Sequence, residues 1–238
     1  MTGPEPVGVR VRMRHLGEPV ALLFGRLGLT PNGLTLIGFG ITVAGAALAG
    51  LGLWLAAGIV VFVGGAFDLL DGALARATGR ASTVGAFLDS VFDRWGESVV
   101  YTGIVIGCLN ADFNLGAILA AVAMSEAFLV SYARARAEGL GLGLGGGSGM
   151  AAVGLAPREV RLVILSLGLL ASGLLGGVQA AGTTTGTGTS TGAWGLAADS
   201  DGARVLAAAL SLIAILATIT VIQRIIHVTK QAATSDGK

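Results

Sequence analysis

The longest stretch without a charged side chain in this chain of 238 residues covers residues 27–67. As an α-helix at about 1.5 Å per residue it would extend roughly 60 Å, twice the ~30 Å hydrocarbon thickness of a bilayer. We therefore expect two membrane crossings here, with a turn at the glycine-rich centre around Gly50 and Gly52 and with Trp54 at a membrane interface. This feature predicts an integral membrane protein.

The composition agrees with that prediction. Only 12% of the residues are charged, against about 25% in a soluble domain, and the mean hydropathy is +0.81. The net charge of +1 indicates no strongly basic surface, so no nucleic-acid partner is expected. The single cysteine, Cys108, can form neither an internal disulfide nor a zinc cluster by itself. Disordered chains, coiled coils and disulfide-stapled secreted domains are excluded.

Four further apolar segments follow, at about residues 87–109, 115–132, 162–178 and 205–226. The expected fold class is therefore an all-α integral membrane protein with six transmembrane helices, of which Thr30-Pro31-Asn32 opens the first. Residues 1–28 mix apolar and basic side chains, which favours a cytoplasmic amphipathic helix on the membrane surface. Residues 29–230 are then the membrane domain, and residues 231–238 a cytoplasmic tail.

The basic residues predict the orientation. Of the 15 lysines and arginines, all but Arg204 fall on one side of the expected crossings. The positive-inside rule makes that side cytoplasmic, which places both termini and the inner ends of the helices inside the cell membrane. Two low-complexity segments, residues 139–150 and 182–192, are expected to be loops on the cytoplasmic and outer sides.

Four acidic residues lie inside the apolar pattern, where charge is costly and usually functional. Asp68 and Asp71 are three residues apart, and Asp89 and Asp93 are four apart, so each pair shares a helix face. A short link predicts that the two helices are antiparallel neighbours whose carboxylates converge near the inner surface. Such a cluster requires counter-charge, and two Mg²⁺ or Mn²⁺ ions suit its oxygen donors. Divalent ions of this kind stabilise phosphoryl transfer.

Small and basic residues accompany these acids. Gly72 and Gly85 permit close approach of a ligand, and Arg76 can pair with a phosphate. The full spacing Asp-x2-Asp-Gly-x2-Ala-Arg-x8-Gly-x3-Asp-x3-Asp, from Asp68 to Asp93, resembles the signature of the CDP-alcohol phosphotransferase (CDP-alcohol phosphatidyltransferase) family. The resemblance implies an enzyme that transfers a substituted phosphate, here a phosphatidyl group, from CDP-diacylglycerol to an alcohol with release of CMP. It also implies a homodimer.

The resemblance assigns roles to individual residues. Asp68, Asp71, Asp89 and Asp93 would hold the metals, and Asp93 would also act as general base on the acceptor hydroxyl. The residues implied at the CDP-donor site are Pro31, Asn32, Thr35, Asp68, Gly72, Ala75, Arg76 and Gly85. Glu97 and Glu126 lie deeper in their segments and are interpreted as helix-pairing or supporting groups.

Three segments outside the signature, residues 131–139, 157–161 and 223–227, resemble actinobacterial phosphatidylinositol phosphate synthases. That resemblance implies inositol 1-phosphate (also named the 3-phosphate) as acceptor and phosphatidylinositol phosphate as product. A phosphorylated acceptor requires a cationic pocket. The residues implied for the acceptor phosphate are Arg134, Arg158, Arg161 and Arg224.

Alternative functions remain open at this stage. A phosphatidylglycerophosphate synthase or an archaeal-type ether-lipid homologue would use similar chemistry on another acceptor or donor. A cation or proton transporter would need acids near the membrane midplane and an internal repeat, and the sequence shows neither. A non-catalytic scaffold gives no reason for the complete signature.

Overall fold

The computed structural model describes residues 23–142, 153–178 and 200–236. This part of the chain is helical and contains no β-strand. Its helices are α2 (Pro31–Gly50), α3 (Trp54–Ala77), α4 (Thr83–Asn110), α5 (Asn114–Gly139), α6 (Arg158–Leu174) and α7 (Asp201–Asp236). They overlap the six apolar segments expected from the sequence. The all-α character is confirmed, whereas six membrane crossings stay a prediction.

Local sequence signals account for the beginning of the first of these helices and for the turn that follows it. Thr30 is the N-cap of α2 and its Oγ1 accepts a hydrogen bond from Gly33 N at 3.1 Å, with Pro31 in the first turn, as expected. The turn to α3 contains Gly52 at φ +75°, a left-handed conformation that favours glycine. The turn thus forms where the sequence predicts it.

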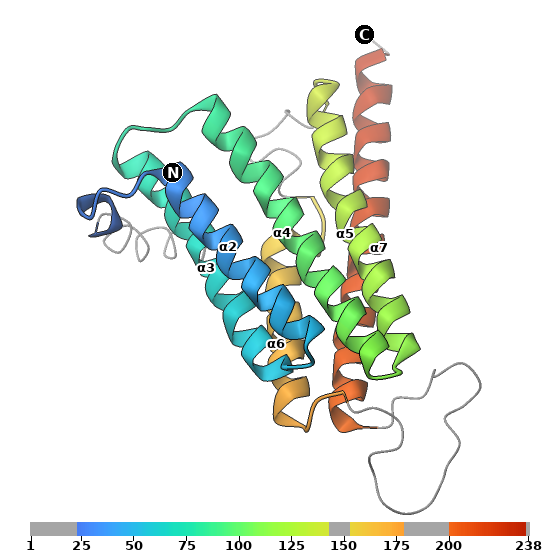
Figure 1. The fold of residues 1–238 in the computed structure, drawn as a ribbon. Coiled ribbons are helices and arrows are strands. Elements are labelled where there is room, and N and C mark those ends of the chain that lie inside the picture. Colours follow the sequence, from blue (N-terminus) through green and yellow to red (C-terminus); the bar gives the residue numbers. More distant parts are fainter. Residues whose placement is uncertain (1–22, 143–152, 179–199, 237–238) are drawn as a thin grey trace, which may run out of the picture.

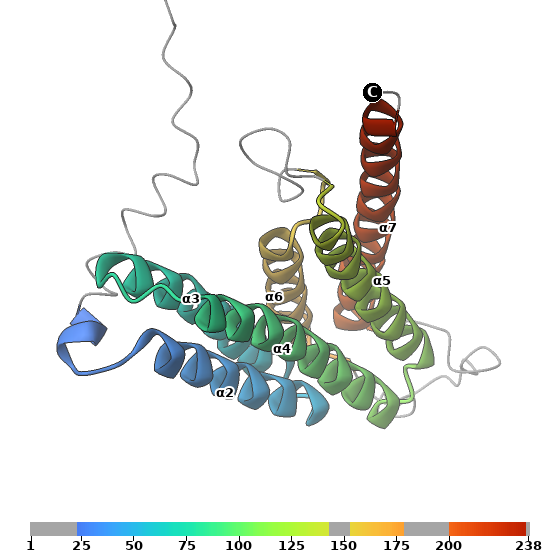
Figure 2. The same cartoon turned by 90° about the horizontal axis from the view of Figure 1, so that it is seen from above.

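The helices form a bundle in which neighbours in sequence are not always neighbours in space (Figures 1 and 2). Helix α2 packs against both α3 and α4, α3 packs against α6, and α5 packs against α4 and α7. The expectation that α3 and α4 are direct antiparallel neighbours is wrong in one respect, because these two helices make little contact with each other. Both are held instead by α2.

Small residues explain why α2 and α4 approach so closely. A Cβ atom at Gly103 or Gly107 of α4 would overlap the backbone carbonyl oxygen of Ala46 or Ala49 in α2. The two glycines are four residues apart and lie on one face of their helix, an arrangement that lets membrane helices pack backbone to backbone. The close contact of α2 and α4 therefore depends on the absence of side chains at these positions.

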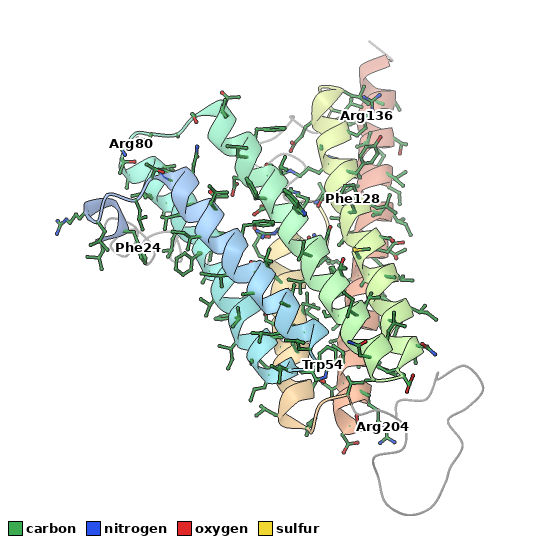
Figure 3. All side chains as sticks on the ribbon, in the orientation of Figure 1. Phe24, Trp54, Arg80, Phe128, Arg136 and Arg204 are labelled. Atoms are coloured by element: carbon green, nitrogen blue, oxygen red, sulfur yellow. The ribbon has the colours of Figure 1, made fainter. Side chains whose placement is uncertain are left out.

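The main buried core takes side chains from all six helices, and a second, smaller cluster comprises Leu34, Ala73 and Leu74. Fully buried side chains of the main core include Tyr101, Ile104, Leu169 and Leu210. Trp54 lies toward the end of the bundle that carries Arg204 (Figure 3), but its side chain is only 2% exposed, so it packs into the main core rather than facing lipid. Its expected place at a membrane interface was inferred from its position beside the glycine-rich turn, which does not reveal its packing partners.

Four helices are long and apolar enough to cross a membrane: α2, α3, α5 and residues 201–233 of α7. Helix α4 carries four charged residues between Asp89 and Glu97, and α6 has 17 residues. Large apolar side chains such as Ile59, Phe62 and Ile215 are exposed on the outside of the bundle, where lipid would cover them. The fold is that of a membrane protein.

Arg80 and Arg136 lie at one end of the bundle and Arg204 at the other (Figure 3), as the distribution of basic residues in the sequence predicts. Of the expected N-terminal amphipathic segment, residues 23–26 are helical and residues 1–22 lie outside the described residues. Most of the two expected low-complexity loops also falls outside them, within 143–152 and 179–199.

Candidate active site

The beginnings of helices α2 and α4 lie close together. Ser82 is the N-cap of α4, and its Oγ accepts a hydrogen bond from Gly85 N at 3.0 Å. A Cβ at Gly85 would lie 3.3 Å from Oδ1 of Asn32, in the first turn of α2. Helix beginnings present unpaired N–H groups and attract anions. Asn32 and Gly85, expected together at the CDP-donor site, therefore lie side by side.

Arg76 and the small residues of the signature lie on the last turns of α3. The Arg76 side chain is exposed, and a Cβ at Gly72 would lie 3.3 Å from its Nη1. Ala75 and Pro31 are half-buried. A larger residue at position 72 would crowd the Arg76 guanidinium, so the small residue there leaves room for this cation.

Asp71 is bonded to the neighbouring helix α2. Thr35 Oγ1 donates a hydrogen bond to Asp71 Oδ2 at 2.6 Å, and the two residues are 7% and 4% exposed. The bond fixes the Asp71 carboxylate relative to the beginning of α2. Thr35, expected to contact the donor, thus contacts one of the expected metal ligands.

Arg158, the first residue of α6, lies between two of the expected metal ligands. Its Nη2 is 2.5 Å from Asp68 Oδ2 and its Nη1 is 2.9 Å from Asp93 Oδ1. Asp93 Oδ2 also contacts Arg94 Nη1 at 3.2 Å. One guanidinium therefore joins α3 and α4, which scarcely touch each other, and it supplies positive charge between their carboxylates.

The four carboxylates share one electrostatic environment. Asp71 is repelled by Asp89 and Asp68, while Asp93 is repelled by the same two residues and attracted by Arg158. Within the described residues, no three His, Cys, Asp or Glu side chains come close enough to hold one metal ion. Since Arg158 separates Asp68 from Asp93, and Thr35 engages Asp71, the acids gather without forming a single compact ligand set.

The four arginines expected at the acceptor phosphate lie on α5, α6 and α7. Arg134 pairs with Glu138 one turn along α5 at 2.8 Å, and both side chains remain partly exposed. Arg224 is 4% exposed and donates to the backbone carbonyls of Val153, at 3.1 Å, and Val130. It is repelled by Arg134 and Arg161. Like charges gathered in this way favour an anionic ligand.

Arg161 differs from the other three because all its nitrogen atoms are engaged by the protein. Its Nε and Nη2 each lie 2.8 Å from an oxygen of Glu97, and its Nη1 lies 2.8 Å from Ala156 O. The side chain is 1% exposed. The interpretation of Glu97 as a helix-pairing group is confirmed, since the pair joins α4 to α6.

Sequence reasoning did not identify Thr220 of α7, which bonds to the segment before α6. Its Oγ1 accepts hydrogen bonds from Leu155 N at 3.1 Å and Ala156 N at 2.9 Å. A threonine in an apolar helix usually bonds to its own backbone, so the sequence contains no signal for this contact.

The chain is similar to known proteins in both sequence and fold. The sequence profile of the family described as CDP-alcohol phosphatidyltransferase matches residues 28–234. The archaetidylinositol phosphate synthase of Pyrococcus horikoshii is 32% identical over 68% of this chain and 80% of its own length. The phosphatidylinositol phosphate synthase of Streptomyces avermitilis is 31% identical over 92% of this chain and 80% of its own length.

The fold is similar to solved structures of the Mycobacterium tuberculosis phosphatidylinositol phosphate synthase. The structure with CDP-DAG bound has a TM-score of 0.69 at 28% identity, covering 90% of this chain and 94% of that one. The structure in complex with manganese and citrate also has a TM-score of 0.69, at 29% identity, covering 89% and 88%. The chain belongs to the CDP-alcohol phosphatidyltransferase family.

Proposed function

We propose that this transferase is a phosphatidylinositol phosphate synthase. It transfers the phosphatidyl group of CDP-diacylglycerol to inositol 1-phosphate, giving phosphatidylinositol phosphate and CMP. The observation that carries the proposal is the position of Arg158, which contacts Asp68 and Asp93 and belongs to the same helix as the buried Arg161. Arg158 thus links two groups of residues, as a reaction between two phosphorylated substrates requires. These are the acidic cluster (Asp68, Asp71, Asp89 and Asp93) and the other arginines expected at the acceptor phosphate (Arg134, Arg161 and Arg224).

The donor site comprises the helix ends around the acidic cluster. Asn32, Gly85 and the exposed Arg76 lie there, and they suit a diphosphate because helix beginnings and arginine both bind phosphate oxygens. Further residues assigned to this site are Pro31, Thr35, Asp68, Gly72 and Ala75.

The acidic residues fit a divalent-metal site by their chemistry. Asp68 and Asp71 on α3 and Asp89 and Asp93 on α4 supply only oxygen donors, which Mg²⁺ and Mn²⁺ prefer. Two such ions would stabilise the charge that develops on the diphosphate and on the departing CMP. A relative's structure in complex with manganese supports this assignment.

In the transfer step, Asp93 takes the proton of the acceptor hydroxyl. The hydroxyl oxygen forms a bond to the β-phosphorus, and the bond from that phosphorus to the bridging oxygen breaks. CMP departs with the electron pair of the broken bond. Contacts of Asp93 with Arg158 and Arg94 hold the carboxylate oriented for this proton transfer.

The acceptor phosphate is assigned to Arg134, Arg158, Arg161 and Arg224. Arg158 has the clearest support, whereas Arg161 would have to release one of its contacts with Glu97 or Ala156 to bind a phosphate. The Nε of Arg158 is buried and has no hydrogen-bond partner among the described residues. A buried donor of this kind is costly unless a ligand accepts its hydrogen bond. A phosphate oxygen of the acceptor would do so while the two Nη atoms face the carboxylates.

The proposed topology has six crossings of the cell's inner membrane, with both termini and the active site cytoplasmic. Residues 29–230 form the membrane domain, residues 1–28 an amphipathic surface segment and residues 231–238 a tail. The distribution of basic residues in the sequence, with Arg204 alone on the other side of the expected crossings, supports this orientation. A homodimer is part of the proposal through family resemblance alone.

A second candidate has direct support from a relative. The similarity to the archaetidylinositol phosphate synthase of Pyrococcus horikoshii favours the same acceptor with an ether-lipid donor. A glycerol 3-phosphate acceptor would also suit an arginine pocket.

The test is CMP release by the purified protein in detergent or vesicles. We expect turnover of CDP-diacylglycerol with inositol 1-phosphate in the presence of Mn²⁺ or Mg²⁺, loss of turnover with a chelator and recovery when the metal is restored. Parallel assays with a CDP-activated ether lipid distinguish the second candidate. Turnover that is unaffected by chelation contradicts the metal assignment.

A further inference from the structure

The position of Arg158 depends on whatever holds the beginning of α6. Arg158 is the first residue of that helix, and its N-cap, Pro157, makes no side-chain capping bond. The preceding residues 153–157 have no regular secondary structure. The backbone N–H and C=O groups of this segment are not used in a helix, so they can form hydrogen bonds with side chains of other helices. Those hydrogen bonds determine where Arg158 lies.

Thr220 of α7 supplies two of these bonds. Its side chain is fully buried, and its Oγ1 accepts from the backbone N–H groups of Leu155 and Ala156 while donating to Leu216 O at 2.7 Å. Gly154 packs against the same side chain: its φ is +122°, and a Cβ there would overlap Thr220 Cγ2. The hydroxyl and the glycine fit together, which fixes this segment on α7.

Two further side chains hold the same segment. Arg224 Nε donates to Val153 O, and Arg161 Nη1 donates to Ala156 O. The Arg161 side chain is itself fixed by Glu97 of α4. Residues 153–156 are thus attached to α7 at two points and to α4 through Arg161, immediately before the residue that reaches the acidic cluster.

We propose that Thr220 is a positioning residue for the transfer reaction. It holds residues 153–157 so that Arg158 reaches Asp68 and Asp93 with its Nε directed at the acceptor phosphate, and it contacts neither substrate itself. The proposal rests on the proposed function, because it treats Arg158 as an acceptor ligand. Thr220 therefore affects use of the acceptor much more than binding of the CDP-linked donor.

The chain offers a matched control two residues away. Thr218 lies on the same helix and donates to Ala214 O at 2.9 Å, the same kind of bond that Thr220 makes to Leu216. The described contacts of its hydroxyl do not include the segment before α6. Thr220→Val and Thr218→Val thus remove the same group from the same helix, and only the former removes the acceptor of two backbone N–H groups.

The experiment measures KM for inositol 1-phosphate, KM for CDP-diacylglycerol and kcat for both variants and for Thr220→Ser, which keeps the hydroxyl. We expect Thr220→Val to raise the acceptor KM by about tenfold or more, since small misplacements of binding groups have effects of this size or larger. The donor KM should stay within about twofold, and Thr220→Ser and Thr218→Val should resemble the wild type. Backbone amide exchange at Leu155 and Ala156 should accelerate in Thr220→Val alone.

Equal acceptor KM values in Thr220→Val and Thr218→Val overturn the proposal, as does an equal loss in both KM values and kcat. Should Thr220→Val not fold, Gly154→Ala, which disturbs the same contact from the other side, must show the same selective rise in acceptor KM. A wild-type protein that uses glycerol 3-phosphate instead refutes the proposed function, and the variants are then compared with that acceptor. If the wild type turns over neither acceptor, unchanged amide exchange in Thr220→Val overturns the positioning role.

Discussion

Nη2 of Arg158 lies 2.5 Å from Oδ2 of Asp68, which joins the beginning of α6 to the first acid of the signature on α3. The same guanidinium reaches Asp93 on α4. Helices α3 and α4 are otherwise held together mainly through α2. Arg158 therefore connects three helices at the acidic cluster, and it lies 65 residues beyond Asp93 in the sequence.

Replacement of Arg158 by Gln tests this contact. The variant loses the charge that faces both carboxylates and the donor proposed for the acceptor phosphate. Since a hydrogen bond to a charged group contributes about 1.5–3 kcal/mol, kcat/KM for inositol 1-phosphate should fall by about 10- to 150-fold. Steady-state CMP release measures it. Arg136→Gln, which removes an exposed arginine of α5, is the control, and an equal loss in the control contradicts the assignment.

Replacement of Asp93 by Asn tests the proposed base. The amide keeps the size of the side chain but cannot accept the proton, so kcat should fall by about 10²- to 10⁴-fold. The rate of CMP release under saturating substrates measures the effect. Asp112→Asn, in the turn between α4 and α5, should retain full activity. Near-normal turnover by the Asp93 variant would show that another group accepts the proton.

Replacement of Thr35 by Val removes the hydrogen bond to the buried Asp71 carboxylate. The unpaired carboxylate should lower the stability by about 1–3 kcal/mol and impair activity, because a buried acceptor loses its donor. Thermal unfolding in detergent and CMP release measure the two effects. Thr42→Val is the matched control, since the Thr42 hydroxyl donates to Gly38 O in its own helix. Thr35→Ser should preserve both properties, and a Ser variant as impaired as Val argues against the hydrogen bond.

The buried pair of Glu97 and Arg161 should be sensitive to removal of one partner. Arg161→Met leaves the Glu97 carboxylate, which is 10% exposed, without its partner, and about 3–5 kcal/mol of stability should be lost. The double variant Glu97→Met with Arg161→Met should recover much of that loss, since apolar pairs often replace buried ion pairs without cost. Thermal midpoints of the single and double variants measure the coupling. Additive losses would mean that the two residues do not stabilise the bundle as a pair.

The sequence predicts the helices of this protein well because membrane crossings depend on a local property. Apolar length determined where α2, α3 and α5 lie, and Thr30 with Pro31 determined where α2 begins. The packing of α3 and α4 was predicted less well. Whether consecutive helices touch depends on where small residues such as Gly103 and Gly107 permit close approach to a third helix, and a short link does not reveal that.

The acidic signature was also visible in the sequence, because its spacing reflects helix geometry. The partners of those acids were not. Arg158 and Asp68 are separated by 90 residues, and Arg161 and Glu97 by 64, so only the fold pairs them. Thr220 could not be predicted at all, since its function depends on two backbone N–H groups of a distant irregular segment.

The most direct test of the account is the choice of acceptor by the wild-type protein. CMP release from CDP-diacylglycerol with Mn²⁺ is compared for inositol 1-phosphate, glycerol 3-phosphate, inositol and serine at equal concentrations. We predict turnover with inositol 1-phosphate well above the other three. Free inositol and serine lack the phosphate that the arginines would bind, and the similarity to a phosphatidylinositol phosphate synthase favours inositol 1-phosphate over glycerol 3-phosphate. Turnover with glycerol 3-phosphate and none with inositol 1-phosphate would contradict it.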